Sequence, residues 1–200
     1  MRTARLEAFS DGVFSIAATL LVLELRVPAP DEHGLAATLL RQWPSYAVYA
    51  VSFLTIGIIW VNHHALFDLL RKVDRPLLFL NLLLLLCVAA VPFPTAVLGQ
   101  YLSSNADAHI AAAAYGLVMI VMGICFGAIW TYVTRDDGLL VEHVSLPHAR
   151  ATAPRFVAGL LFYLVGIGLA AFSAQLSLVV YALAAAYYIL PTLPRLGRGV

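Results

Sequence analysis

The sequence predicts an all-α membrane protein with six transmembrane helices, folded as a single domain over residues 1–200. Of its 200 residues, 62% are hydrophobic and 12% are charged, whereas soluble domains average about 45–50% apolar and about 25% charged residues. Apolar stretches of about 20 residues, long enough to cross a bilayer as a helix, recur with almost no charge inside them. This pattern excludes a soluble globular domain, and the net charge of +1 gives no argument for nucleic-acid binding.

Each predicted span ends where charged or turn residues appear. Charges gather between the second and third spans and between the fourth and fifth, and both connections are predicted to be loops. Pro92 and Pro94 are expected to kink the outer half of the third span. Glycines such as Gly166 and Gly168 in the fifth span favour close helix packing. The predicted spans are Phe9–Val27, Trp43–Phe67, Leu77–Gln100, Ala108–Val133, Thr152–Ala171 and Ala174–Leu193.

The positive charges orient these spans, because Lys and Arg near span ends are retained on the cytoplasmic side. With the N-terminus inside, only Arg26 and Arg41 fall outside, and six crossings place both termini in the cytoplasm. A cleaved signal peptide is the alternative for the first span, but Glu7 and Asp11 stand at its start and no A-x-A site follows it. The positive residues predicted to be cytoplasmic are Arg2, Arg5, Arg71, Lys72, Arg75, Arg135, Arg150, Arg155, Arg195 and Arg198.

The first span carries the residues that point to a function, because ionisable and hydroxyl groups are costly in hydrocarbon and tend to face a bundle interior or water. A helix turning about 100° per residue gives this span two neighbouring stripes. The polar stripe consists of Asp11, Ser15, Thr19 and Arg26. The branched apolar stripe consists of Ile16, Leu20 and Leu23. These stripes either pack against neighbouring helices or line a permeation path with hydrophobic constrictions.

Two sequence patterns identify a related family. The segment Arg5–Asp11 reads R-x-x-x-F-S-D, and the segment Trp60–His64 in the second span reads W-x-N-H-H. Both closely resemble signatures of the transmembrane protein 175 family of potassium channels, whose bacterial members also have six spans in about this length. The resemblance implies a homotetramer in a prokaryotic plasma (inner) membrane, with the first helix of each subunit around a central pore for potassium ions.

The resemblance also implies where the pore narrows. In the family, rings of branched apolar side chains on the first helix form the constriction, and the matching positions are Ile16, Leu20 and Leu23. No T-V-G-Y-G filter occurs in the sequence. Thr19, about one turn beyond Ile16, is the candidate for selectivity, because its hydroxyl places oxygen beside the constriction. The alternative is that this hydroxyl bonds a carbonyl of its own helix.

The signature residues are implied to form a structural lock at the cytoplasmic mouth. Asp11 needs partners if it is buried, and polar groups on the second span are positioned to supply donors. The alternative is that Asp11 is an exposed charge that draws cations inward. The residues of this cytoplasmic lock are Arg5, Phe9, Ser10, Asp11, Trp60, Asn62, His63 and His64.

Other functions and ligands are disfavoured. His63 and His64 point about 100° apart on a helix, so they do not both reach one ion, and we expect neither a metal site nor a cofactor. One of the two is expected to join the lock and the other to face a subunit boundary. No span presents a nucleophile with a base and an oxyanion donor, which argues against an enzyme. A secondary transporter of cations or small solutes is the alternative, although the inverted repeats typical of that class are missing.

Two further features are minor. The extracellular end of the first span gathers acidic residues, either as a vestibule that concentrates cations or as a solvated loop with local ion pairs. They are Glu24, Asp31 and Glu32. Cys87 and Cys125 lie inside apolar stretches, where we expect small hydrophobic side chains and no disulfide.

Overall fold

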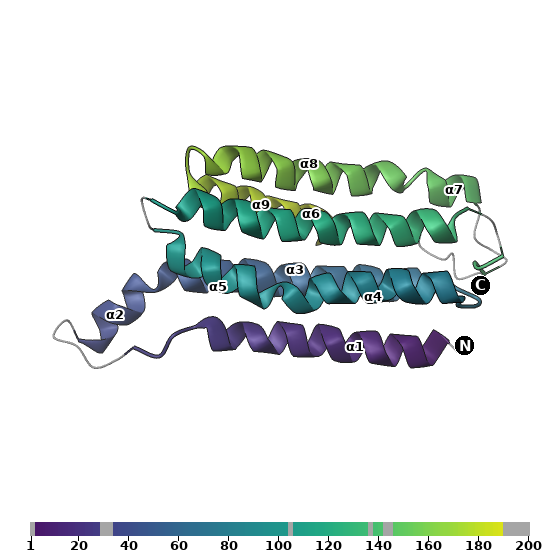
Figure 1. Cartoon of the computed structure of the whole chain (residues 1–200), viewed down its shortest axis with the longest axis horizontal. Helices are drawn as coiled ribbons and strands as arrows, with labels where there is room; N and C mark the ends of the chain where they lie inside the picture. Colours follow the sequence, from purple (N-terminus) through teal and green to yellow (C-terminus); the bar gives the residue numbers. More distant parts are fainter. Residues whose placement is uncertain (1–2, 29–33, 104–105, 136–137, 142–145, 190–200) are drawn as a thin grey trace.

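The computed structural model describes residues 3–28, 34–103, 106–135, 138–141 and 146–189, and within them the regular elements are helices (Figure 1). The main helices run side by side along the long axis of the molecule. The elements are α1 (Thr3–Leu20), the 3-10 turn η1 (Leu21–Glu24), α2 (Leu35–Arg41), α3 (Trp43–Phe67), α4 (Arg75–Ala90), α5 (Pro92–Tyr101), α6 (Ala108–Val133), α7 (Leu146–Arg150), α8 (Ala153–Ala170) and α9 (Ala174–Ile189).

The lengths of these helices suit a membrane protein. Four helical segments are long and apolar enough to cross a bilayer, namely Thr3–Glu24, Trp43–Phe67, Arg75–Tyr101 and Ala108–Val133. Two apolar helices are shorter, at Phe156–Ala170 and Ala174–Ile189. The chain is therefore a membrane protein whose described regular elements are helices. Four of the six predicted spans correspond to helical segments long enough to cross a bilayer, and the fifth and sixth overlap the two shorter apolar helices.

The boundaries agree with the prediction where strong breakers flank an apolar stretch. The second and fourth predicted spans coincide with α3 and α6. The third is divided into α4 and α5 at Val91, directly before Pro92, because proline has no N–H to continue the helix. The first span is different, since its α-helix ends at Leu20 rather than continuing to Val27.

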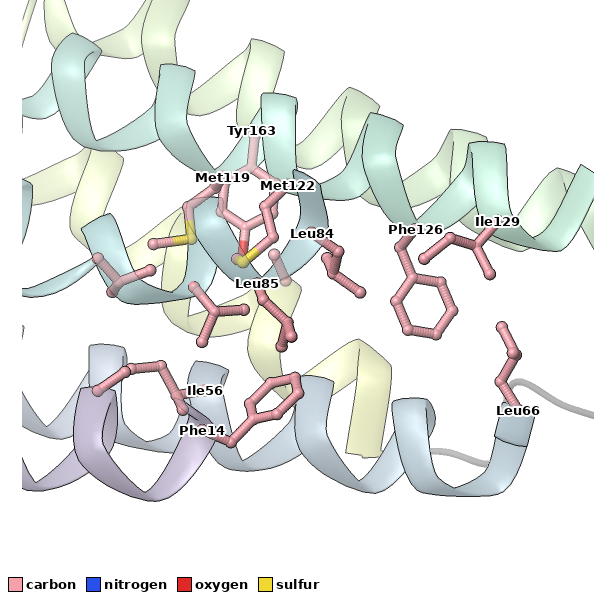
Figure 2. Close-up of a cluster of buried hydrophobic side chains, with 14 of the residues drawn as sticks. Phe14, Ile56, Leu66, Leu84, Leu85, Met119, Met122, Phe126, Ile129 and Tyr163 are labelled. Atoms are coloured by element: carbon pink, nitrogen blue, oxygen red, sulfur yellow. The ribbon is translucent and has the colours of Figure 1, made fainter. Parts of the chain in front are cut away.

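Buried apolar side chains from several helices meet in the centre of the bundle (Figure 2). Phe14 of α1 and Ile56 of α3 lie on one side of this core, and Met119 of α6 and Tyr163 of α8 lie on the other. Phe14 is only 3% exposed. One face of α1 is thus held against the bundle, and α1 contacts α3 and α4.

The predicted lock residues and most of the basic loops belong to one end of the bundle. The start of α1, the α3–α4 connection and the end of α6 lie together there, opposite to α2 (Figure 1). The connections predicted as loops are tied to each other, because the Arg71 amide donates to the Leu139 carbonyl at 2.8 Å and the Val141 amide donates to the Leu69 carbonyl at 3.0 Å. Arg2, Arg195 and Arg198 lie outside the residues that the structure describes.

Close packing of α8 on α9 depends on Gly166. A Cβ at this position would overlap the ring of Tyr181, whereas a Cβ at Gly168, two residues away, would meet nothing within 4 Å. We expect Gly166→Ala to destabilise the fold by about 1–3 kcal/mol through overpacking. Gly168→Ala is the matched control and should leave stability equal or slightly higher. Thermal unfolding in detergent measures both, and equal midpoints for the two variants would contradict the packing role.

Candidate functional site: the exposed face of the first helix and its anchors

One face of α1 is open while the opposite face is buried. The predicted constriction residues Ile16, Leu20 and Leu23 are 61%, 41% and 73% exposed, whereas Ala17 is 1% exposed. Leu23 belongs to η1, so it does not continue the 100° stripe on which the prediction placed it, because a 3-10 helix turns by about 120° per residue. All three side chains nevertheless lie exposed, which a pore-lining role requires.

Thr19 lies on the same open face and is engaged with its own helix. Its Oγ1 lies 2.9 Å from the Ser15 carbonyl oxygen and 3.0 Å from the Ile16 carbonyl oxygen, to which it donates. This is the back-bonded arrangement considered as the alternative. The hydroxyl oxygen retains its lone pairs for water or a cation, so the role of Thr19 in selectivity stays a prediction.

The buried face of α1 is anchored by a polar network that crosses three helices. Asn81 of α4 donates from Nδ2 to Ser10 Oγ at 3.0 Å, and its Oδ1 lies 2.8 Å from His63 Nε2 of α3. Ser10 in turn donates to the Leu6 carbonyl at 2.9 Å. Because Asn81 Oδ1 can only accept, His63 carries its proton on Nε2. Ser10, Asn81 and His63 each have a hydrogen-bond partner in this network, as buried polar side chains require.

The His63 ring is also fixed by aromatic neighbours. It stacks on Phe67 with ring centroids 4.2 Å apart, and the Phe14 ring of α1 lies 5.3 Å away. His63 is 2% exposed. Of the two histidines, His63 is therefore the one linked to the signature segment of α1, through Asn81, a partner that the sequence did not predict.

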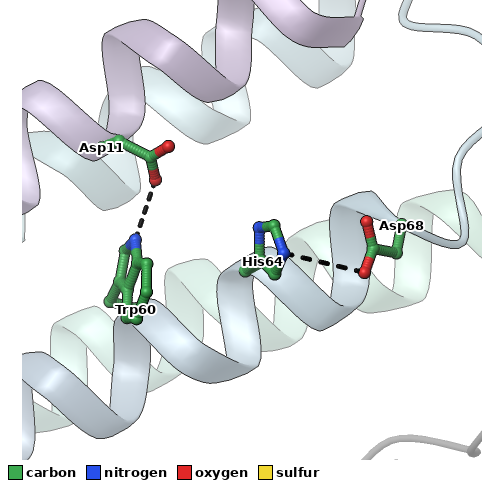
Figure 3. A network of polar contacts seen from close by, with 4 residues as sticks. All are labelled: Asp11, Trp60, His64 and Asp68. Atoms are coloured by element: carbon green, nitrogen blue, oxygen red, sulfur yellow. Dashed lines mark hydrogen bonds and ion pairs between the residues drawn. The ribbon is translucent and has the colours of Figure 1, made fainter.

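Asp11, the neighbour of Ser10, is anchored separately, by a contact between α1 and α3 on the exposed side of these helices (Figure 3). Trp60 donates from Nε1 to Asp11 Oδ1 at 2.8 Å. The Trp60 ring stacks on His64, with centroids 6.1 Å apart, and His64 Nε2 lies 3.8 Å from Asp68 Oδ2. The His64–Asp68 pair is more than half exposed, so it adds little stability. The Asp11–Trp60 bond joins the two signature segments directly, whereas Ser10 and His63 are joined through Asn81.

The remaining lock residues are less engaged within the chain. Phe9 is 55% exposed, and Arg5 is exposed with no hydrogen bond found to other described residues. Asn62 donates to the Ile58 carbonyl of its own helix at 2.9 Å. Arg5 and Phe9 thus lie on the open side of α1, where a neighbouring subunit would have access to them.

The two histidines have different partners, because His63 contacts Asn81 of α4 and His64 pairs with Asp68, four residues further along the chain. In the described part of the chain, no group of three or more His, Cys, Asp and Glu side chains is positioned to hold a metal ion.

The segment that follows α1 has charges of both signs. Arg26 donates from Nη2 to Gln100 Oε1 at 2.9 Å. A hollow of about 370 Å³ is lined by Glu24, Arg26 and Arg41 among others. Asp31 and Glu32, the other members of the predicted acidic vestibule, lie outside the described residues.

Comparisons with known proteins agree with this architecture. Residues 5–92 match the family model described as endosomal/lysosomal potassium channel TMEM175. A protein of Streptomyces collinus named as a potassium channel is 53% identical over 187 residues, covering 93% of this chain and 91% of that protein. A potassium channel of Chamaesiphon minutus is 40% identical over 191 residues, covering 94% of each chain.

A solved structure extends the match to the fold. The crystal structure of a lysosomal potassium-selective channel TMEM175 homolog from Chamaesiphon minutus superposes with a TM-score of 0.85 at 38% identity. The superposition covers 95% of this chain and 97% of that one. The chain belongs to the TMEM175 family of potassium channels.

Proposed function

We propose that this chain is a potassium-permeable cation channel that works as a homotetramer, with α1 of each subunit around a central pore. The open face of α1 carries this proposal, because Ile16, Leu20 and Leu23 are exposed while the opposite face is anchored by a buried polar network. The family is one of ion channels rather than enzymes.

The proposed topology has six membrane crossings and both termini in the cytoplasm of a prokaryotic cell, in its plasma membrane. The described basic residues support it, because the segments that hold Arg5, Arg71, Arg75 and Arg135 share one end of the bundle. Arg41 ends α2 at the opposite end. The positive-inside rule then assigns the first of these ends to the cytoplasm.

Permeation through such a pore differs from permeation through a carbonyl filter. Four branched alkyl side chains at one level offer no oxygen to replace a hydration shell, so ions pass hydrated when the ring is wide. When the ring is narrow, the segment dewets and conduction stops. Ile16 is the proposed narrowest ring, with Leu20 and Leu23 as further rings toward the outside.

Flux measurements on the purified protein in liposomes test this function. We expect potassium flux down an imposed gradient that does not saturate at low ion concentration and needs no coupled second ion. Sodium and proton gradients measured in parallel give the ion preference. Flux that saturates or depends strictly on a counter-ion would overturn the channel proposal and favour the secondary transporter.

Substitutions of Thr19 test how the channel distinguishes potassium from sodium. We expect Thr19→Val to lower the potassium-to-sodium permeability ratio with the tetramer intact, because valine keeps the branched shape but deletes the oxygen. Loss of an oxygen contact worth about 1 kcal/mol corresponds to a roughly fivefold fall in this ratio. Thr19→Ser is the control and should largely retain it. If Thr19→Val keeps the parental permeability ratio, the Thr19 hydroxyl has no role in selectivity and only bonds carbonyls of its own helix.

A further inference from the structure

The two cysteines of the chain meet on neighbouring helices. Cys87 of α4 and Cys125 of α6 lie with their Sγ atoms 4.0 Å apart, and both are half-buried. The adjacent residues Leu86 and Ile124 are 66% and 54% exposed. The pair therefore lies at the outer surface of the bundle, between α4 and α6, and the proposed pore makes no use of it.

The distance between the sulfurs favours a bridging ion over a disulfide. A disulfide of about 2.05 Å requires the sulfurs to approach by about 2 Å from their observed separation of 4.0 Å. Metal–thiolate bonds of about 2.3 Å on each side of a linearly coordinated ion require sulfurs about 4.6 Å apart. The observed Sγ–Sγ distance of 4.0 Å is shorter than this by about 0.6 Å. Rotation of the two cysteine side chains is sufficient to separate the sulfurs by this amount.

The number and charge of the ligands restrict the ion further. Zinc requires about four ligands, and no cluster of three or more metal-binding side chains occurs among the residues described by the structure. Two thiolates neutralise one divalent cation, so the complex is neutral in apolar surroundings. A monovalent ion such as Ag⁺ leaves a net negative charge there, which is costly to bury.

We propose that Cys87 and Cys125 bind one divalent thiophilic cation with linear coordination, of which Hg²⁺ is the representative, as a bridge between α4 and α6. With HgCl₂ as the source, the two S–H bonds break and two Hg–S bonds form. Two protons and two chlorides leave to water, and no atom is oxidised or reduced. The bridge connects α6 to the helix whose Asn81 anchors α1.

Binding of HgCl₂ to the purified wild-type protein, measured by intact mass after washing with excess glutathione, tests this site. We expect one mercury per chain, a loss of two protons, and no thiol left to react with a maleimide. Cys87→Ala and Cys125→Ala should each hold mercury through one thiol and release it at least tenfold faster. The variant with both substitutions should retain none after the wash, which controls for the histidines.

Moving one of the two cysteines tests whether mercury is held by a bridge between the helices or only by two thiols in the same chain. Cys87→Ala with Leu83→Cys keeps two thiols per chain but moves one by a helical turn, about 6 Å. This variant should release mercury as fast as the single-cysteine variants, with an unchanged detergent sizing profile. Two mercury atoms per wild-type chain, equal release from the displaced pair, or a disulfide formed without metal would each overturn the proposal.

Discussion

Replacing Ile16 by Asn is expected to raise cation flux and to make it less selective. Ile16 is 61% exposed on the open face of α1, and a tetramer would place four such side chains at one level of the pore. Four amides in place of four alkyl groups favour a wetted constriction, which lowers the barrier to hydrated ions. A barrier lowered by about 1.4 kcal/mol raises the flux about tenfold.

The measurement is potassium and sodium flux in liposomes at equal amounts of reconstituted tetramer. Ile124→Asn is the matched control, because Ile124 is 54% exposed on α6, which does not belong to the helices packed on α1. It introduces the same amide at similar exposure and should leave flux and selectivity unchanged. Leu23→Asn should have a weaker effect than Ile16→Asn if Ile16 is the narrowest ring. Unchanged flux in both Ile16→Asn and Leu20→Asn would contradict the proposal that α1 lines the pore.

Most of the helical architecture could be predicted from the sequence because its signals are local. The bounds of α3 and α6 follow from long apolar stretches with polar or turn residues at both ends, and the division between α4 and α5 follows from Pro92. The end of α1 could not be predicted in this way. Hydropathy remains high through Leu25, with no Gly or Pro between Leu20 and Pro28, so composition does not distinguish the 3-10 turn from continued α-helix.

The anchors of α1 were only partly predictable because they depend on contacts between distant segments. The signature patterns singled out Ser10, Asp11, Trp60 and His63, but the partner that links Ser10 to His63 is Asn81. A signal for it was present, since Asn81 is a lone amide inside an apolar stretch of leucines. Such a group is costly in hydrocarbon unless it finds partners. Periodicity alone does not identify which helix provides them.

The bond between Asp11 and Trp60 should matter more for assembly than for ion preference. Asp11→Ala leaves the Trp60 indole N–H without its acceptor at 2.8 Å. A hydrogen bond to a charged acceptor contributes about 1.5–3 kcal/mol, and we expect the lower end because Trp60 is 41% exposed. A tetramer loses four such bonds at once. Detergent sizing should therefore show much less tetramer in Asp11→Ala, while the tetramer that remains keeps its ion preference.

Asp11→Asn distinguishes the two roles considered for Asp11, a structural lock and a charge that attracts cations to the cytoplasmic mouth. Asparagine keeps an Oδ1 that accepts from Trp60 but removes the negative charge, so a lock predicts nearly parental assembly and flux. Trp60→Phe removes the donor instead and should weaken assembly as Asp11→Ala does. Combining Asp11→Ala with Trp60→Phe should then add little, because both changes delete the same contact. An Asp11→Asn channel that assembles normally but loses cation preference would show that the carboxylate draws cations inward and that the lock assignment of Asp11 is wrong.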